Sequence, residues 1–175
     1  MFKLKRFPDG LIKKFKARFC ARGDQKIKGV DFFKTYAPVV QWTPVYLMLV
    51  LEVLLGLKFK QEDVTVAFLH ADLEEEEEVF VRMPRGFQKV GNVWKLKENL
   101  YGLCHSPCAF WIYMVEEMGL CDMTQSELDP CLFVGEQVIC IVYIDDMISW
   151  AKDKNDIHEL TLKLREEWGR LGAGR

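Results

Sequence analysis

Residues 140–150 read CIVYIDDMISW, an apolar run that is interrupted by two adjacent carboxylates, Asp145 and Asp146. A carboxylate held away from water costs several kcal/mol unless it is paired or bound to a cation. The apolar segments on either side, 138–142 and 147–151, predict the two strands of a hairpin with both aspartates at or beside its tip. The stretch therefore predicts an antiparallel pair of strands whose turn exposes two like charges.

Two explanations of this aspartate pair are open. Aspartate is favoured in turns, so the pair can be turn chemistry alone. Alternatively, a hard divalent cation such as magnesium, which takes oxygen ligands, neutralises the two charges. A third carboxylate favours the cation, because Asp63 lies at the centre of a predicted strand over 57–66 that can lie beside the hairpin. Three aspartates on adjacent strands would hold two metal ions about 4 Å apart, an arrangement suited to phosphoryl transfer.

The remaining segments predict a mixture of strands and helices. Thr43, Pro44 and Gly56 mark the start and end of a buried helix. The other predicted elements are a basic hairpin over 2–23 that turns at Pro8-Asp9-Gly10, strands over 78–83 and 94–97, a helix over 106–119, strands over 131–134 and 137–142, and a helix over 153–171. This order is typical of an α+β fold.

Composition limits the class of protein. A chain of 175 residues with 50% hydrophobic residues suits one domain with a packed core, and it excludes a disordered protein. The first residues lack the apolar segment of a secretory signal. The most apolar run, 47–57, is too short to cross a bilayer and carries Glu52. We therefore expect a soluble, intracellular protein that is not secreted.

Charge is distributed unevenly along the chain. Residues 1–35 hold 11 Lys and Arg against 3 Asp and Glu, whereas the remainder holds 13 against 23. This asymmetry indicates contact with a polyanion at the N-terminal end, or alternatively a solvated basic hairpin. The six cysteines show no CxxC spacing, so free buried thiols are expected. In CHSPC, Cys104, His105 and Cys108 could supply metal ligands, but the sequence offers no second half-site.

Several motifs together carry a family resemblance. YIDD resembles the YxDD box of reverse transcriptases, and QEDVTVAFLHADLEEEEEVFVRMPRGF resembles the palm segment of copia-type long-terminal-repeat retrotransposon polymerases. Further matches are FKARFCARG, TYAPVV, LYGLCHSPCAFW and SELDPCLF. All of them run in the order of that family. The sequence thus resembles a copia-type retrotransposon reverse transcriptase, an RNA-directed DNA polymerase.

The resemblance implies a fold of fingers and palm, with a mainly antiparallel sheet packed on helices. We expect one truncated reverse transcriptase domain over 1–175, with a fingers-like basic hairpin region over approximately 1–42 and a palm-like region over 43–171. In the family a thumb and a ribonuclease H domain follow the palm. The resemblance in this sequence ends with the palm-like region, so we expect the thumb to be absent here.

The resemblance also implies a set of site residues. Asp63, Asp145 and Asp146 match the catalytic, metal-binding triad of the family, and the backbone carbonyl of Val64 would be a further metal ligand. Phe68 matches the aromatic residue that lies under the sugar and discriminates against a 2′-hydroxyl, although a core phenylalanine is the alternative. The other nucleotide-binding positions that the resemblance implies are Lys16, Arg18, Arg22, Tyr101 and Gly102.

The function implied is nucleotidyl transfer from a deoxynucleoside triphosphate to a primer 3′-hydroxyl, with two Mg²⁺ ions, for which Mn²⁺ can substitute. The expected partners are an RNA template and a DNA primer, with no membrane. Self-association, or a thumb and ribonuclease H portion supplied in trans, is also expected. The expected location is the cytoplasm, in a virus-like particle, or the nucleus.

Departures from the family support an alternative function. Cys104 and Cys108 stand where the family has basic residues, and Tyr46 stands where an arginine is common, so phosphate contacts are lost. The alternative is a catalytically silent retroelement relic that is at most a weak nucleic-acid-binding or interaction protein. A metal-dependent nuclease ranks third, since no histidine adjoins the triad in sequence. The glutamate run over 74–78 is expected to be a solvated face without a site.

Overall fold

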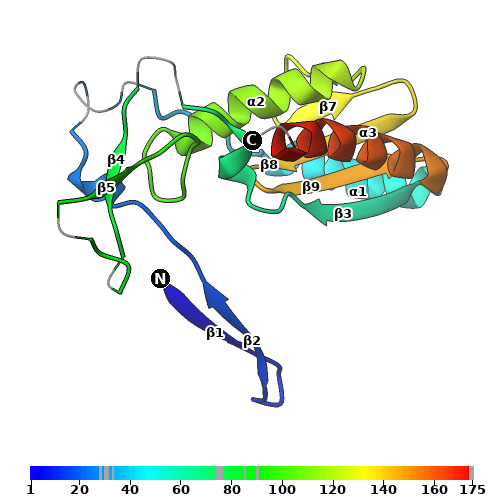
Figure 1. The fold of residues 1–175 in the computed structure, drawn as a ribbon. Helices are drawn as coiled ribbons and strands as arrows, with labels where there is room; N and C mark the ends of the chain where they lie inside the picture. Colours follow the sequence, from blue (N-terminus) through cyan, green and yellow to red (C-terminus); the bar gives the residue numbers. More distant parts are fainter. Residues whose placement is uncertain are drawn as a thin grey trace.

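The central element of the fold is a five-stranded antiparallel sheet. The computed structural model describes residues 1–173 apart from positions 28, 30, 31, 33, 74–76, 85 and 90. The strand order is β3-β9-β8-β7-β6 (Figure 1). The strands are β3 (Lys58–Asp63), β6 (Thr124–Gln125), β7 (Leu132–Val134), β8 (Val138–Tyr143) and β9 (Asp146–Ala151). The hairpin predicted from the aspartate pair is confirmed as β8 and β9, next to each other in this sheet.

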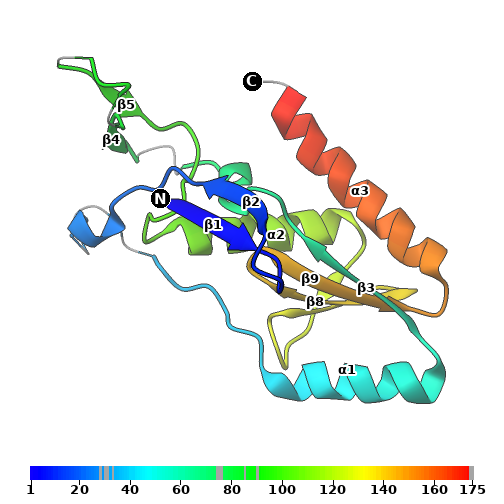
Figure 2. The same cartoon turned by 90° about the horizontal axis from the view of Figure 1, so that it is seen from below.

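Helices cover both faces of the sheet. Helices α2 (Ser106–Leu120) and α3 (Lys154–Ala173) lie on one side, and α1 (Trp42–Leu55) lies on the other (Figure 2). Both faces of β8 are apolar: Val142 packs in the cluster with α2 and α3, whereas Ile141 packs in the cluster with α1. A strand that is buried on both sides reads as a continuous apolar run, and this explains the sequence before the aspartates.

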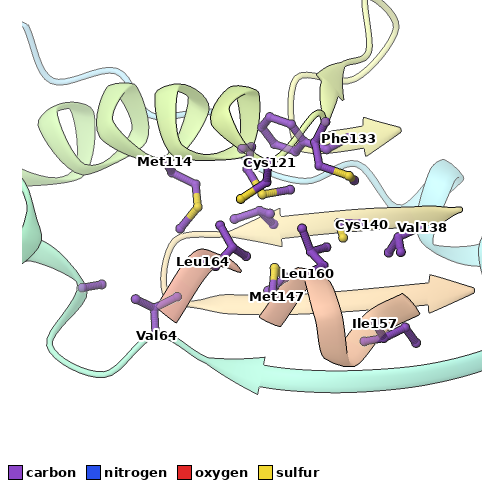
Figure 3. Close-up of a cluster of buried hydrophobic side chains, with 14 of the residues drawn as sticks. Val64, Met114, Cys121, Phe133, Val138, Cys140, Met147, Ile157, Leu160 and Leu164 are labelled. Carbon is purple, nitrogen blue, oxygen red and sulfur yellow. The ribbon is translucent and has the colours of Figure 1, made fainter. Parts of the chain in front are cut away.

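The larger core lies between the sheet and the pair α2 and α3. Figure 3 shows Met114 of α2 and Leu164 of α3 near Val64 and Met147. Phe110, Met114 and Met118 repeat at helical spacing on α2 and are almost fully buried, which agrees with the predicted helix over 106–119. This core holds β8 and β9 in register, and it therefore fixes the position of the turn between them.

The prediction that the helix over 43–56 is buried is wrong. Helix α1 contacts the sheet through one side only, and within the described residues Met48 is its one buried side chain. Trp42 is 70% exposed and Val53 is 81% exposed, because no described element covers the outer side of the helix. Glu52 is half-buried, and its carboxylate accepts a hydrogen bond of 3.0 Å from the indole N–H of Trp150.

The predicted strand over 57–66 is shorter than expected. Strand β3 ends at Asp63, so this aspartate lies at the end of the strand and not at its centre. Val66 adopts a left-handed backbone conformation and leads into the short 3-10 helix η2 (Ala67–His70). The chain turns here because the left-handed residue breaks the extended conformation.

The N-terminal hairpin is confirmed. Strands β1 (Phe2–Arg6) and β2 (Ile12–Ala17) pair antiparallel around the predicted turn, in which Gly10 has a φ of 85°. A second small sheet joins β4 (Phe80–Arg82) and β5 (Val93–Lys95), both within one or two residues of their predicted positions. The described helices include none that is both long enough and apolar enough to cross a membrane.

Candidate functional site

The three predicted aspartates lie at one end of the sheet. Asp63, the last residue of β3, is the direct partner of Asp146, the first residue of β9. Asp145 lies in the turn between β8 and β9, and its carbonyl oxygen accepts a hydrogen bond of 2.6 Å from the Val64 N–H. Asp63 and Asp146 are exposed, and Asp145 is half-buried. The backbone therefore joins the end of β3 to the turn and brings the three residues to the same end of the sheet.

Two residues beside these aspartates have an unusual backbone conformation that the sequence did not predict. Ile144 has a φ of 52° and Val66 has a φ of 54°. Left-handed backbone costs an L-residue about 1–2 kcal/mol, and it is rare for β-branched side chains. Ile144 directly precedes Asp145, and Val66 follows the Val64 hydrogen bond by two residues. Strain of this kind is found at functional sites, where surrounding contacts maintain it.

The end of β3 is held against α3 by a polar network. The Thr161 hydroxyl donates to Glu62 Oε2 at 2.7 Å, and Lys60 Nζ lies 2.9 Å from Glu62 Oε1. Glu62 and Asp63 are adjacent in a strand, so their side chains point to opposite faces of the sheet. The network therefore fixes the end of β3 against α3, on the face of the sheet opposite to the Asp63 side chain. Its hydrogen bonds do not involve the Asp63 carboxylate.

The carboxylate oxygens at this end of the sheet are ligands of the kind that a hard divalent cation prefers. Asp63 and Asp146 are neighbours on one face, and like charges directly opposite each other repel. Within the described residues, no Lys, Arg or His forms an ion pair with any of the three aspartates. The same residues contain no group of three His, Cys, Asp or Glu side chains placed to hold a metal ion. The backbone thus places three acidic residues at one end of the sheet, as a cation site requires. The carboxylates of these three residues do not converge on a single point.

Three of the predicted residues, Phe68, Tyr101 and Arg18, contact one another close to the aspartates. The rings of Phe68 and Tyr101 are 4.7 Å apart between centroids, and the Arg18 guanidinium carbon lies 5.2 Å from the centre of the Tyr101 ring. Burial raises the pKa of Tyr101, and the charges of Asp145 and Asp63 raise it further while Arg18 opposes them. Tyr101 is therefore within electrostatic reach of the carboxylates.

Lys16 belongs to the same group, whereas Arg22 does not. Burial lowers the pKa of Lys16, the nearby charges of Arg18 and Lys5 lower it further, and Asp63 acts in the opposite direction. Arg22 instead forms an ion pair of 2.6 Å with Asp24. In the described part of the chain Arg22 forms no ion pair with the three aspartates, and its hydrogen bonds go to Asp24.

Gly102 is required by a close approach of two backbone segments. It has a φ of 92°, and a Cβ at this position would lie 2.2 Å from the carbonyl oxygen of Ala21. The Ala21 N–H donates to the carbonyl oxygen of Tyr101 at 2.8 Å. On the partner segment, a Cβ on Gly23 would lie 2.0 Å from the Gly102 carbonyl oxygen. This crossing connects the segment after β2 to Tyr101 and so places the N-terminal hairpin relative to the site.

A cavity of about 1110 Å³ lies beside this crossing and was not predicted. Its lining includes Lys26, Glu77 and His105, in which one Glu77 carboxylate oxygen lies 3.2 Å from Lys26 Nζ and 3.3 Å from His105 Nδ1. The CHSPC motif offers Cys104, His105 and Cys108 as metal ligands, but in the structure Cys104 Sγ donates to the Gly23 carbonyl oxygen at 3.3 Å. All six cysteines are free, as predicted, but Cys20, Cys104 and Cys108 are half-buried and not buried as expected.

Comparisons with known proteins agree with the resemblance. A family model described as reverse transcriptase (RNA-dependent DNA polymerase) matches residues 1–171. The chain is 35% identical to the retrovirus-related Pol polyprotein from transposon TNT 1-94 of Nicotiana tabacum over 168 residues. This match covers 91% of this chain and 12% of that protein. It is 30% identical to the Pol polyprotein from transposon RE1 of Arabidopsis thaliana, over 86% of this chain and 11% of that protein.

A yeast relative extends the match. The transposon Ty1-NL2 Gag-Pol polyprotein of Saccharomyces cerevisiae is 31% identical over 177 residues, which cover 96% of this chain and 9% of that protein. The chain thus spans 9 to 12% of the length of these relatives. Because the family model matches almost the whole chain, this protein belongs to the reverse transcriptase (RNA-dependent DNA polymerase) family.

Proposed function

We propose that this domain catalyses RNA-directed DNA synthesis, in which a primer 3′-hydroxyl attacks the α-phosphate of a deoxynucleoside triphosphate and releases pyrophosphate. The observation that carries the proposal is the pairing of Asp63 with Asp146 beside Asp145 at one end of the sheet. RNA template, DNA primer and nucleotide are the partners in this reaction. We assign the fingers to approximately 1–42 and the palm to 43–171.

The carboxylates of Asp63, Asp145 and Asp146 and the carbonyl of Val64 would hold two Mg²⁺ ions. When bound, such ions activate the attacking hydroxyl and stabilise the charge on the leaving pyrophosphate. The hydrogen bond from the Val64 N–H to the Asp145 carbonyl keeps the end of β3 beside the turn that carries Asp145. The residues of the sheet thus hold the carboxylates at fixed backbone positions before substrate arrives.

The residues around the carboxylates would bind the nucleotide. Lys16 and Arg18 supply positive charge near Asp63, which suits the polyphosphate of a triphosphate. Phe68 and Tyr101, whose rings are tilted by 52° to each other, form an aromatic surface on which a sugar or a base can pack. Gly102 keeps Tyr101 next to the hairpin through the backbone crossing at Ala21. Arg22 would reach a triphosphate only after its ion pair with Asp24 opens.

Two observations favour a second candidate, a nucleic-acid-binding domain without catalysis. The aspartate side chains form no three-ligand group within the described residues. Cys104, which stands in place of a basic residue, donates to a backbone carbonyl and offers no positive charge to a phosphate.

The test is primer extension on an RNA template with a DNA primer, in Mg²⁺ and in Mn²⁺. Asp63→Asn and Asp145→Asn are compared with Asp122→Asn, which removes the same charge from an exposed position away from the site. Template-dependent extension that is lost in both site variants and kept in Asp122→Asn supports a polymerase. A folded chain that binds the primer–template without extending it supports the second candidate.

A further inference from the structure

The strand that carries Asp63 lies at the edge of the five-stranded sheet. Within the described residues its neighbour in that sheet is β9, and the last pair of the β3 and β9 ladder joins Asp63 to Asp146. Two carboxylates that are direct partners repel each other, so this terminal pair is the part of the ladder that opens most easily. The ends of elements open with free energies close to zero unless other contacts hold them. The position of Asp63 therefore depends on the contacts on either side of the pair.

One contact lies directly beyond the terminal pair. The Val64 N–H donates to the Asp145 carbonyl oxygen at 2.6 Å, and Val64 is buried. This hydrogen bond runs from the end of β3 to the turn before β9, so it forms only while the terminal pair is closed. The Val64 amide is therefore a reporter of the pair, because its exchange with solvent requires the end of β3 to leave the turn.

A second contact lies one residue before the pair. The Glu62 side chain is only 13% exposed, and it lies on the face of the sheet opposite to the Asp63 side chain. Its Oε1 lies 2.9 Å from Lys60 Nζ, and its Oε2 accepts a hydrogen bond of 2.7 Å from the Thr161 hydroxyl. Arg165 lies 3.8 Å from Oε1 and is exposed, so it adds little. Both carboxylate oxygens of Glu62 are therefore engaged.

Thr161 is the buried partner of Glu62 and belongs to α3. Its hydroxyl has one proton and lies 2.7 Å from Glu62 Oε2 and 2.8 Å from the Ile157 carbonyl oxygen. The charged acceptor forms the stronger hydrogen bond, so the proton goes to Glu62. Lys60 Nζ donates to the same hydroxyl oxygen at 3.2 Å, but Lys60 belongs to β3 itself. The Thr161 hydroxyl is therefore the contact that joins the end of the strand to the packed helix.

We propose that Thr161 is a positioning residue. Through Glu62 it holds the pair of Asp63 and Asp146 closed against the repulsion of their carboxylates, and it thereby preforms this end of the sheet for a divalent cation. That the cation is the Mg²⁺ of DNA synthesis rests on the proposed function. The apparent affinity for the ion is reduced by the fraction of molecules in which the pair is open. Thr161 thus acts on ion binding from the opposite face of the sheet, through Glu62 and the backbone of β3.

Two substitutions at one position separate the hydroxyl from the packing. Thr161→Val keeps the branched shape and removes the hydroxyl, whereas Thr161→Ser keeps the hydroxyl. The matched control is Leu160→Val at the preceding residue of α3, whose side chain lies in the larger core (Figure 3). This control removes one methylene from the packing of the helix and leaves the hydrogen bond to Glu62 in place.

The first measurement is hydrogen exchange of the Val64 amide by NMR, with a chelator present. The Val142 amide is the internal reference for opening of the whole sheet, because it is buried in β8 and donates to the Cys131 carbonyl oxygen at 2.9 Å. We expect Thr161→Val to lower the protection of Val64 about tenfold relative to Val142, since a hydrogen bond to a charged group is lost. Thr161→Ser should keep the natural ratio, and Leu160→Val should leave it unchanged.

Asp63→Asn tests the repulsion in the same measurement. It removes one charge from the terminal pair, so we expect the protection of the Val64 amide to rise by about two- to fivefold. The two substitutions, Asp63→Asn and Thr161→Val, should thus change the exchange of one amide in opposite directions.

The second measurement is a titration with Mn²⁺, in which electron paramagnetic resonance counts the free ion. We expect Thr161→Val to raise the Kd for Mn²⁺ by about three- to tenfold, because fewer molecules have the pair closed. Thr161→Ser should restore the affinity of the natural chain. Leu160→Val should leave the affinity unchanged, although it weakens the packing of the same helix. Asp63→Asn should remove the binding.

Three results would overturn the proposal. An equal ratio of Val64 to Val142 protection in Thr161→Val and Leu160→Val would mean that Thr161 contributes packing alone. Unchanged protection of Val64 in Asp63→Asn would mean that no repulsion opposes the pair. Unchanged Mn²⁺ affinity in Thr161→Val, with binding lost in Asp63→Asn, would mean that the ion does not need the closed pair.

Failure of the proposed function gives a different result. A natural chain that binds no Mn²⁺, or that binds it as tightly after Asp63→Asn, would count against a metal-dependent polymerase. The exchange of the Val64 amide needs neither an ion nor a substrate, so it would still decide whether Thr161 holds the pair of Asp63 and Asp146 closed.

Discussion

Asp63 and Asp146 are direct partners across the pairing of β3 and β9, on the same face of the sheet. Their mutual repulsion destabilises the metal-free domain, because like charges directly opposite each other weaken a β-pair. A cation between them would reverse this effect. The pair therefore connects the stability of the domain to metal binding, and this connection can be measured without any assay of activity.

Replacing one member of the pair tests this connection. We expect Asp146→Asn to increase the free energy of unfolding by about 0.2–1 kcal/mol in the absence of divalent ions. Mg²⁺ should stabilise the natural chain in proportion to its occupancy and should stabilise the variant much less. Thermal unfolding at matched ionic strength measures both effects. An equal response of the two chains to Mg²⁺ would mean that these carboxylates do not bind the ion.

The titration of Tyr101 reports on the same carboxylates. Its pKa is raised by burial and by Asp145 and Asp63. We expect Asp145→Asn to lower the pKa of Tyr101 and Arg18→Gln to raise it, measured by phenolate absorbance after subtraction of the Tyr101→Phe spectrum. Since the folded pKa lies above the unfolded one of about 10, the stability that Tyr101 contributes is present below pH 10 and is lost as pH rises through the folded pKa. No change in either variant would place Tyr101 beyond the influence of these charges.

Five of the six free cysteines should divide into two classes by reactivity. Burial raises the pKa of Cys140 to about 12, and burial together with Asp129 raises that of Cys131 to about 12. Because the thiolate is the reactive form, both should resist alkylation of the native chain near pH 8. Cys20, Cys104 and Cys108 are only half-buried and should react first. Mass spectrometry of the labelled peptides, with a denatured sample as the control, measures the order. Early labelling of Cys140 would mean that the sheet opens.

The backbone crossing at Gly102 should be intolerant of any side chain. Gly102→Ala adds a Cβ at 2.2 Å from a carbonyl oxygen and forces alanine to a φ of 92°. The left-handed conformation alone costs about 1–2 kcal/mol, and the clash adds to it. We expect clear destabilisation and faster proteolysis of the N-terminal hairpin.

The matched control is Gly119→Ala, on helix α2, where a Cβ would meet nothing within 4 Å. Alanine is favoured over glycine in a helix, so this variant should gain up to about 1 kcal/mol. Denaturant unfolding measures both variants. Similar behaviour of the two would show that the crossing does not require glycine.

The central hairpin, the N-terminal hairpin and helix α2 could be predicted from sequence because each has a strong local signal. Apolar strands on both sides of Asp145 and Asp146 indicated β8 and β9, and Pro8-Asp9-Gly10 indicated the first turn. Helix α1 was placed within one residue, but its burial was misjudged. An apolar sequence shows that a helix can be buried, and only the tertiary structure shows what covers it.

The finer parts of the site had no sequence signal. Strand β6 has two residues and no periodicity of its own, so only its pairing with β7 defines it. The end of β3 at Asp63 depends on the left-handed conformation of Val66, which a valine gives no reason to expect. The contacts of Glu77 with Lys26 and His105 join distant segments of the chain. Such long-range contacts are set by packing and not by local preference.

The left-handed conformation of Ile144 also affects how this domain would respond to selection. Glycine or asparagine at this position would remove the backbone strain, so a screen for thermal tolerance alone would favour them. The same change would loosen the turn that carries Asp145. An engineering campaign on this domain should therefore hold residue 144 fixed and look for stabilising changes elsewhere, such as on the uncovered outer side of α1.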